Sequence, residues 1–109
     1  MVARGRSTTF STSLTPDDRV AVELSRRAVR DLKRLGAPDR KQAASALRDT
    51  LGSSPLPPNA DDKPLRGADP WRRLRVGELR VLYRPLARRR LLVARVVHRR
   101  DLERAVARL

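Results

Sequence analysis

Apolar residues in the first half of the chain recur at the three- and four-residue spacing of amphipathic helices. One stripe begins after Ser25, whose side chain can cap the first turn of a helix, and ends at Gly36. A second stripe begins near Pro38, which suits the first turn of a helix, and ends at Gly52. We therefore expect an antiparallel helical hairpin. The stripes consist of Ala28, Val29, Leu32 and Leu35, and of Ala43, Ala44, Leu47 and Leu51.

Other segments alternate apolar and polar residues, which is the pattern of half-buried strands. A short alternation at 20–24 precedes the first helix. Two longer alternations, at 71–76 and 79–86, flank Gly77 and Glu78, a pair that suits a tight two-residue turn. The pattern therefore predicts an N-terminal strand before the helices and a β-hairpin after them.

The remaining segments complete the expected fold. A further strand is predicted at 91–97 and a short amphipathic helix at 101–109, while the Pro-, Gly- and Asp-rich segment 52–70 is expected to be a loop. The order β-α-α-β-β-β-α describes an α+β domain with an antiparallel three-stranded meander over residues 19–109. Residues 1–18 lack periodicity and are expected to form a disordered extension. The alternatives are a transit peptide, which can start with Arg and Ser in this way, and a misassigned start codon.

The composition limits the classes of protein that this chain can form. A length of 109 residues suits one small domain. No apolar run approaches the roughly 18 residues of a membrane span, so we expect a soluble, cytoplasmic protein with no membrane partner. The chain has no cysteine, and its one histidine, His98, cannot form a zinc site alone. We expect no metal and no cofactor.

The net charge of +14 is unevenly distributed along the chain. Residues 71–109 contain 13 arginines and three acidic residues, whereas residues 1–70 contain 13 basic and nine acidic residues. A GC-rich genome would explain why arginine outnumbers lysine by 23 to 3, but not where the arginines lie. This distribution favours a polyanion or an acidic protein as partner.

A two-residue turn at 77–78 would fix which side chains share a face of the hairpin, because directly opposed residues point to the same side of a sheet. One face then carries Trp71, Arg73, Arg75, Arg80 and Arg84, and the other carries Leu74, Val76, Leu79, Val81 and Tyr83 as core. Guanidinium groups match phosphate oxygens and can stabilise charge on an attacked phosphodiester. The first face is therefore a candidate phosphate-binding surface. The alternative is a solvated face, which would normally mix both signs of charge.

His98 follows the last predicted strand and is a candidate proton carrier, because histidine titrates near neutral pH. A lone histidine is more often a structural hydrogen-bonding residue. The face that it occupies depends on the turn at 87–90. An odd number of turn residues would bring His98 beside Arg80, and an even number would send it to the core side, so the sequence leaves both open.

Several segments together resemble the RelE/ParE family of toxins. Leu-Arg-Gly at 65–67 and Trp-Arg-Arg-Leu-Arg-Val-Gly-Glu-Leu-Arg-Val-Leu-Tyr at 71–83 resemble the strand core of the family. Val-Val-His-Arg-Arg-Asp at 96–101 resembles the ending of that motif, and 28–35 resembles the first helix. The likeness covers roughly residues 19–104, with the segments in the expected order.

The resemblance implies a type II toxin that a cognate antitoxin wraps and holds inactive. RelE-like members enter the A site of the 70S ribosome and cut mRNA by attack of a ribose 2′-OH on the adjacent phosphate, without a metal. By motif position, the resemblance assigns Arg73 and Arg75 to contacts with mRNA and ribosomal RNA that aid proton transfer. It assigns Arg80 to the transition-state phosphate and Arg99 to a second phosphate contact.

The chain departs from the family pattern at one position. Many members carry a tyrosine where this chain has Glu103, so His98 or Glu103 would have to take over its role in acid–base chemistry or base stacking. His98 is therefore the fifth expected catalytic residue. The residues expected to bind nucleic acid besides these are Trp71, Arg72, Arg84 and Arg100.

Two other functions stay open at this point. A ParE-like toxin would inhibit DNA gyrase without catalysis, but such relatives generally lack the full set of basic catalytic residues. An inactive RNA-binding module would be supported by interleaved aromatic residues, and only Trp71 is available. The basic set therefore favours RNA cleavage.

Overall fold

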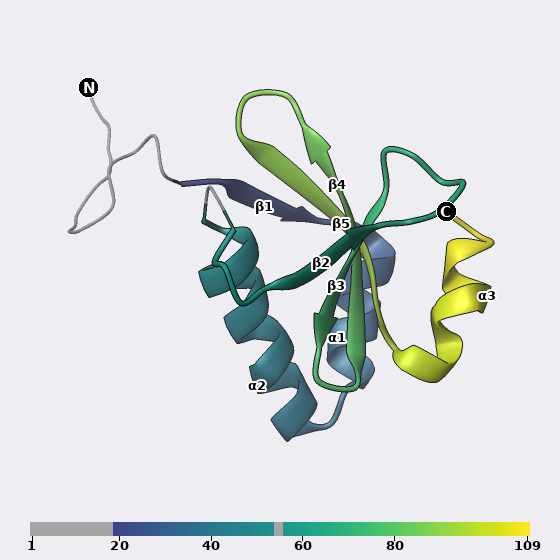
Figure 1. The fold of residues 1–109 in the computed structure, drawn as a ribbon. Helices are drawn as coiled ribbons and strands as arrows, with labels where there is room; N and C mark the ends of the chain where they lie inside the picture. The colour runs from purple at the N-terminus through teal and green to yellow at the C-terminus, as the bar shows by residue number, and fades with distance from the viewer. Residues whose placement is uncertain (1–18, 54–55) are drawn as a thin grey trace.

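The computed structural model describes residues 19–53 and 56–109, so the extension expected at 1–18 lies outside the described residues. Five strands form one sheet in the order β1-β5-β4-β3-β2, in which β1 pairs with β5 in parallel and all other neighbours are antiparallel (Figure 1). The strands are β1 (Ala21–Leu24), β2 (Asp61–Pro64), β3 (Arg72–Val76), β4 (Leu79–Leu86) and β5 (Arg90–His98). The predicted α+β class and meander are confirmed.

The helices also follow the predicted order. The hairpin consists of α1 (Arg26–Arg34) and α2 (Ala37–Ser45), and a π-helical segment, Ala46–Leu51, extends α2 up to Gly52. Ser25 caps α1 as expected, since its Oγ accepts a hydrogen bond from the Ala28 amide at 3.0 Å. The C-terminal helix α3 (Leu102–Val106) follows a short 3₁₀ turn. No helix in the described part of the chain has the length and apolar character needed to cross a membrane.

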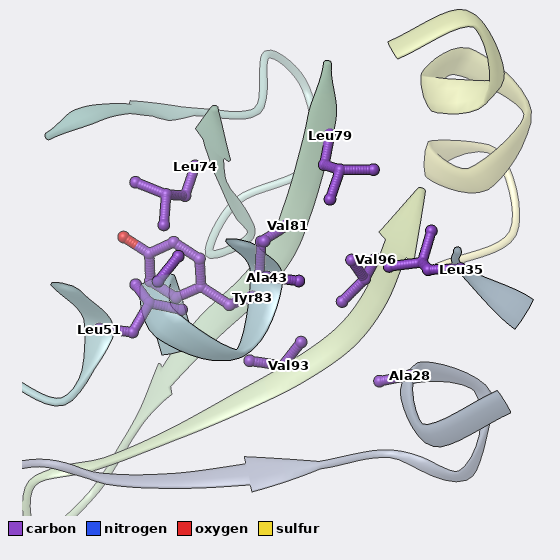
Figure 2. Packing of buried hydrophobic residues seen from close by; sticks show 11 residues of the cluster. Ala28, Leu35, Ala43, Leu51, Leu74, Leu79, Val81, Tyr83, Val93 and Val96 are labelled. Atoms are coloured by element: carbon purple, nitrogen blue, oxygen red, sulfur yellow. The ribbon is translucent and has the colours of Figure 1, made fainter. Parts of the chain in front are cut away.

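The main core lies between the sheet and the helices α1 and α2 (Figure 2). The hairpin residues predicted to face the core do so, with Val76 partly buried at its margin, whereas Val29 and Ala44 of the predicted helical stripes are exposed. The core members from β3, β4 and β5 are Leu74, Leu79, Val81, Tyr83, Val93 and Val96, and the helical side contributes Ala28, Leu35, Ala43, Ala46 and Leu51. The apolar periodicities of the two halves of the sequence thus meet in one cluster.

A smaller cluster lies on the opposite face of the sheet. Leu82 and Val97 are buried there against Ala105 of α3. Figure 1 shows α3 on the far side of the sheet from α2. Partly buried Leu65, Leu102 and Val106 complete this cluster. The arginine-bearing face of the hairpin is therefore not wholly solvated, because α3 covers part of it.

The segment that was expected to be a loop contains β2, so this part of the prediction is wrong. Asp61–Pro64 pairs with β3 at the edge of the sheet, with Asp61 opposite Arg75 and Asp62 opposite Leu74. A four-residue strand that ends in proline has a weak sequence signal, and proline is tolerated at an edge strand because its missing N–H faces away from the ladder.

A bulge in β5 decides the face that His98 occupies. The β4–β5 turn has an odd number of residues between Leu86 and Arg90, which by itself would bring His98 to the face of Arg80. The register then shifts, because Tyr83 pairs with Val93 while Leu82 pairs with Arg95, leaving one extra residue in β5. A one-residue slip reverses the faces of all later side chains, so His98 lies opposite Leu79 on the core side.

Candidate functional site

The β3–β4 turn has the predicted two-residue form. Val76 pairs with Leu79 and Arg75 with Arg80, so Gly77 and Glu78 form the turn. Gly77 has a φ of 58°, a conformation that glycine adopts without steric cost. A Cβ atom at Gly77 would lie 2.9 Å from Nε2 of Gln42, so the turn lies against the flexible end of this exposed side chain of α2.

Arg80 is the most constrained arginine of this face. Its residue is only 9% exposed, and its Nη1 donates hydrogen bonds to the carbonyl oxygens of Gly77 at 3.0 Å and Leu79 at 2.9 Å. It forms no ion pair with any carboxylate of residues 19–53 and 56–109. Burial lowers the pKa of Arg80, and the charges of Arg75 and Arg73 lower it further.

The three neighbouring arginines share two carboxylates. Arg73 and Arg75 lie 3.8 and 3.9 Å from the Asp61 carboxylate, and Arg99 lies 3.1 Å from that of Glu78. The Arg99 amide also donates to the Glu78 carbonyl at 2.9 Å, which ties the end of β5 to the β3–β4 turn. We call Arg73, Arg75, Arg80 and Arg99 the arginine cluster. Its four cations outnumber its two carboxylates.

Asp61 and Glu78 were not singled out from the sequence as members of the site. Asp61 belongs to the strand that the sequence did not reveal, whereas the position of Glu78 in the two-residue turn could have indicated its contact with Arg99. Both carboxylates are substantially exposed, at 41% and 65% of the side chain. Exposed ion pairs of this kind contribute little free energy, so an incoming phosphate can compete with them.

Arg72, which was expected to bind nucleic acid, lies on the opposite face of the sheet from the arginine cluster. It pairs with Tyr83 across the ladder and therefore points to the core face. Its Nη2 donates to Asp62 at 2.7 Å, and the Tyr83 hydroxyl donates to the same carboxylate. The hydrogen bond with Asp62 raises the pKa of Arg72. Arg72 and Arg73 therefore lie on different faces, because adjacent strand residues point to opposite sides of a sheet.

Trp71 and Arg84 lie on the expected face but at a distance from the arginine cluster. The Arg84 guanidinium carbon lies 5.8 Å from the centre of the Trp71 ring, a cation–π contact. Arg84 is four residues from Arg80 along β4, which corresponds to about 13 Å, and the buried Leu82 lies between them. The residues expected on this face therefore form two groups, the arginine cluster and the Trp71–Arg84 pair.

The two remaining expected residues lie elsewhere. His98 is on the core side, one of the two faces that the sequence left open, where its Nε2 is 3.9 Å from the carboxylate of Asp39, and it does not share the face of Arg80. Arg100 is exposed in the 3₁₀ turn after β5. Glu103, the residue at the position of the family tyrosine, is exposed on α3.

The geometry of the arginine cluster suits the binding of one polyanion group. Arg80 is held by backbone acceptors, so little conformational entropy remains to be lost when it binds. Its neighbours are cations that repel it, and a phosphate placed among them would relieve that repulsion. The cluster can therefore hold a phosphodiester and stabilise the extra negative charge that forms when the phosphorus is attacked.

Comparison with known proteins gives concordant matches. The family described as ParE toxin of type II toxin–antitoxin system, parDE, matches residues 22–103. A curated relative from Methanocaldococcus jannaschii, named toxin RelE1, is 36% identical over 81 residues, which are 73% of this chain and 89% of the relative.

Solved structures share the fold. The RelBE2 toxin–antitoxin complex of Mycobacterium tuberculosis matches with a TM-score of 0.64 and 28% identity, covering 74% of this chain and 99% of that one. The RelB–RelE complex of Methanococcus jannaschii also has a TM-score of 0.64, at 23% identity, covering 76% and 96%. YafQ of Escherichia coli has a TM-score of 0.54 at 21% identity, covering 77% and 98%.

Proposed function

Since the chain belongs to the RelE/ParE family of toxins from type II toxin–antitoxin systems, we propose that it is a ribosome-dependent endoribonuclease that cleaves mRNA and inhibits translation. The observation that carries this proposal is Arg80. Its guanidinium is fixed by two carbonyl groups, lacks a carboxylate partner in the described part of the chain and lies among three other arginines, which is an arrangement suited to phosphate.

The proposed chemistry needs no metal. The ribose 2′ oxygen bonds to the adjacent phosphorus and the P–O5′ bond breaks, which leaves a 2′,3′-cyclic phosphate and a 5′-OH end. The 2′-OH proton passes to a base and the 5′ oxygen gains a proton. Arg80 and Arg99 bind the non-bridging oxygens, and their charge stabilises the transition state more than the ground state.

Arg73 and Arg75 have the supporting role in this proposal. They lie on β3 beside Arg80 and form only loose pairs with Asp61. The Arg75 side chain is 52% exposed and that of Arg73 is 16% exposed, so Arg75 is the more available to contact the message and ribosomal RNA. His98 is not part of the proposed site, because it lies on the other face of the sheet. The chain thus supplies chiefly electrostatic stabilisation of the phosphate.

A cognate antitoxin is the proposed regulatory partner. The solved relatives from Mycobacterium tuberculosis and Methanococcus jannaschii are complexes of a toxin with its antitoxin. The net charge of +14 favours an acidic partner. We propose that such an antitoxin keeps the protein inactive in the cytoplasm until it is removed.

The proposed function is tested by mapping message ends on translating ribosomes. Purified toxin is added to ribosomes that are stalled on a defined mRNA, and primer extension locates new 5′ ends. We expect cuts within the A-site codon, cyclic phosphate ends, and no cutting of the same mRNA without ribosomes. Intact messages together with trapped gyrase–DNA complexes would instead identify a gyrase inhibitor, and binding without either effect would identify an inactive RNA-binding relative.

A further inference from the structure

A second basic feature, which includes no member of the arginine cluster, is the groove between α1 and α3. This groove has a volume of about 730 Å³ and runs along the edge of β5. Three arginines line it from each side. They are Arg27, Arg30 and Arg34 on α1, and Arg100, Arg104 and Arg108 at the C-terminal end of the chain. We call this feature the α1–α3 groove.

The charge of the α1–α3 groove is largely uncompensated. All six wall arginines are exposed, and none forms an ion pair or hydrogen bond through its side chain with another residue of the described ranges. The groove contains two carboxylates, Asp31 and Asp101. Asp31 is already engaged, because it accepts hydrogen bonds from Arg95 at 2.9 Å and from the Val96 amide at 2.9 Å. The occupant must therefore be strongly negative.

The floor of the α1–α3 groove does not suit an added strand. β5 extends beyond its partner β1 here, so its edge would otherwise offer free backbone groups. Side chains around α1 satisfy them instead, since the Ser25 Oγ donates to the Ala94 carbonyl at 2.7 Å and Asp31 accepts from Val96. A strand that docked in the groove would find these groups occupied.

The groove also lacks the surface that an amphipathic helix needs. Its apolar lining residues are Leu35, Val96, Val97 and Ala105, which are 8%, 2%, 7% and 3% exposed. A helix that docks through an apolar face would bury almost no additional apolar area. Charge alone remains as the basis for recognition.

No Phe, Tyr or Trp side chain lines the groove, and its one imidazole, His98, lies beside Asp39, which distinguishes between forms of RNA. Proteins that hold single strands usually stack unpaired bases on aromatic rings. Helical RNA has its bases turned inward and is recognised through phosphates and sugars. On α1, the arginine row runs from Arg27 to Arg34, a separation of seven positions or about 10 Å along the helix axis.

We propose that the α1–α3 groove binds the phosphate backbone of helical RNA, separately from the arginine cluster. The proposal rests on the proposed function only in naming RNA as the partner. In that setting the groove would anchor the protein to a structured RNA while the arginine cluster faces the strand that is cut. The groove is therefore a binding site and not a part of the cleavage chemistry.

The test compares two variants of equal charge. The groove variant carries Arg27→Gln, Arg30→Gln and Arg34→Gln. The control carries Arg66→Gln, Arg88→Gln and Arg89→Gln, which are exposed arginines outside the groove. Fluorescence anisotropy measures binding of each full-length protein to a labelled RNA hairpin and to a single strand of equal length. Circular dichroism and the melting temperature check the fold.

We expect the groove variant to bind the hairpin at least about tenfold more weakly in low salt, and its slope of log K against log salt to fall by about 2 to 3. The control should retain nearly the wild-type slope, and the loss on the single strand should be smaller. Equal weakening in both variants would reduce the effect to net charge and overturn the proposal. Tighter binding of a glutamate-rich peptide than of the hairpin, lost in the groove variant, would assign the groove to a protein and also overturn it.

The ribosome assay separates this proposal from the proposed nuclease activity. Hairpin binding that depends on the groove, together with uncut messages, would support the groove as an RNA-binding site and contradict the proposed nuclease activity. Message cleavage, together with a groove variant that binds the hairpin as tightly as the wild type, would support the nuclease activity and contradict the groove as an RNA-binding site.

Discussion

Arg72 and Arg80 lie on adjacent strands of one sheet, yet the two faces place them in opposite electrostatic settings. On the face that packs against α1 and α2, Arg72 is hydrogen-bonded to Asp62, and this bond raises the pKa of Arg72. On the other face, Arg80 is buried among cations, and its pKa is lowered. One face has its charges paired, and the other retains an excess of positive charge.

The difference arises from two consecutive residues of β2. Asp61 points to the face of Arg73 and Arg75, whereas Asp62 points to Arg72 and Tyr83. The contact distances differ as well, since Arg72 lies 2.7 Å from Asp62, while the nearest cluster arginine lies 3.8 Å from Asp61. The Arg72–Asp62 pair is thus tight and the pairs of Asp61 are loose, which supports the proposed role of the arginine cluster in binding a phosphate.

The largest expected effect on stability is that of Asp62→Ala. This change leaves the half-buried Arg72 guanidinium and the buried Tyr83 hydroxyl without their acceptor, which should cost about 2 kcal/mol. Asp61→Ala is the matched control on the other face and should change the free energy of unfolding by less than about 0.5 kcal/mol. Urea denaturation of both variants measures the difference. Equal losses would show that the two faces do not differ in this way.

The conformation of the β3–β4 turn, which determines the face of each hairpin side chain, can be tested by substituting Gly77. Gly77→Ala imposes a left-handed φ on alanine and places Cβ against Gln42, so we expect a loss of about 1 to 2 kcal/mol. Gly67→Ala also has a positive φ, of 73°, but meets no atom within 4 Å, and should lose less. Thermal unfolding of the pair separates backbone strain from packing. A larger loss for Gly67→Ala would contradict the assigned contact with α2.

The ionisation of Tyr83, on the face that packs against α1 and α2, can be observed directly because it is the only tyrosine of the chain. Burial raises the pKa of Tyr83, and its hydrogen bond to Asp62 raises it further. The stabilisation by this phenol is therefore complete below about pH 10, the ordinary tyrosine pKa, and is lost as the pH rises above it. In an ultraviolet titration of the folded protein, phenolate should form only well above pH 10. Ionisation at pH 10 in the native state would refute the buried pairing.

The smallest expected effect concerns Glu78 on the opposite face. Glu78→Gln removes the carboxylate that pairs with Arg99 at 3.1 Å and leaves the size of the side chain unchanged. We expect RNA to bind about two- to threefold more tightly, because the phosphate no longer competes with an exposed ion pair, and stability to stay the same. Anisotropy with labelled RNA gives the affinity. Weaker binding would mean that Glu78 supports the arginine cluster and does not merely occupy Arg99.

Local signals in the sequence were sufficient for most of the fold. Ser25, Gly52 and the Gly77–Glu78 turn mark element boundaries by backbone chemistry, and the turn alone assigned Arg75 and Arg80 to one face. These features depend on neighbouring residues, so they can be read from one sequence.

The features that were missed depend on long-range pairing. Whether 61–64 forms a strand is determined by β3, and the bulge beside Ala94 is held by Ser25, which lies 69 positions away. The bulge decided between the two faces that the sequence left open for His98, and β2 supplied Asp62, the carboxylate that binds Arg72. Motif position identified the cluster arginines, but only the register shows which of their neighbours share their face.

The most direct test of the difference between the two faces of the sheet compares Arg80→Gln with Arg72→Gln in both activity and stability. Ribosome-dependent mRNA cleavage and urea denaturation are measured on both variants. We predict that Arg80→Gln lowers the cleavage rate by about 100-fold or more with little change in stability, whereas Arg72→Gln is less stable but cleaves at nearly the wild-type rate under conditions where it is folded. A folded Arg80→Gln protein that cleaves normally, or an Arg72→Gln protein that loses cleavage as severely, would contradict the account.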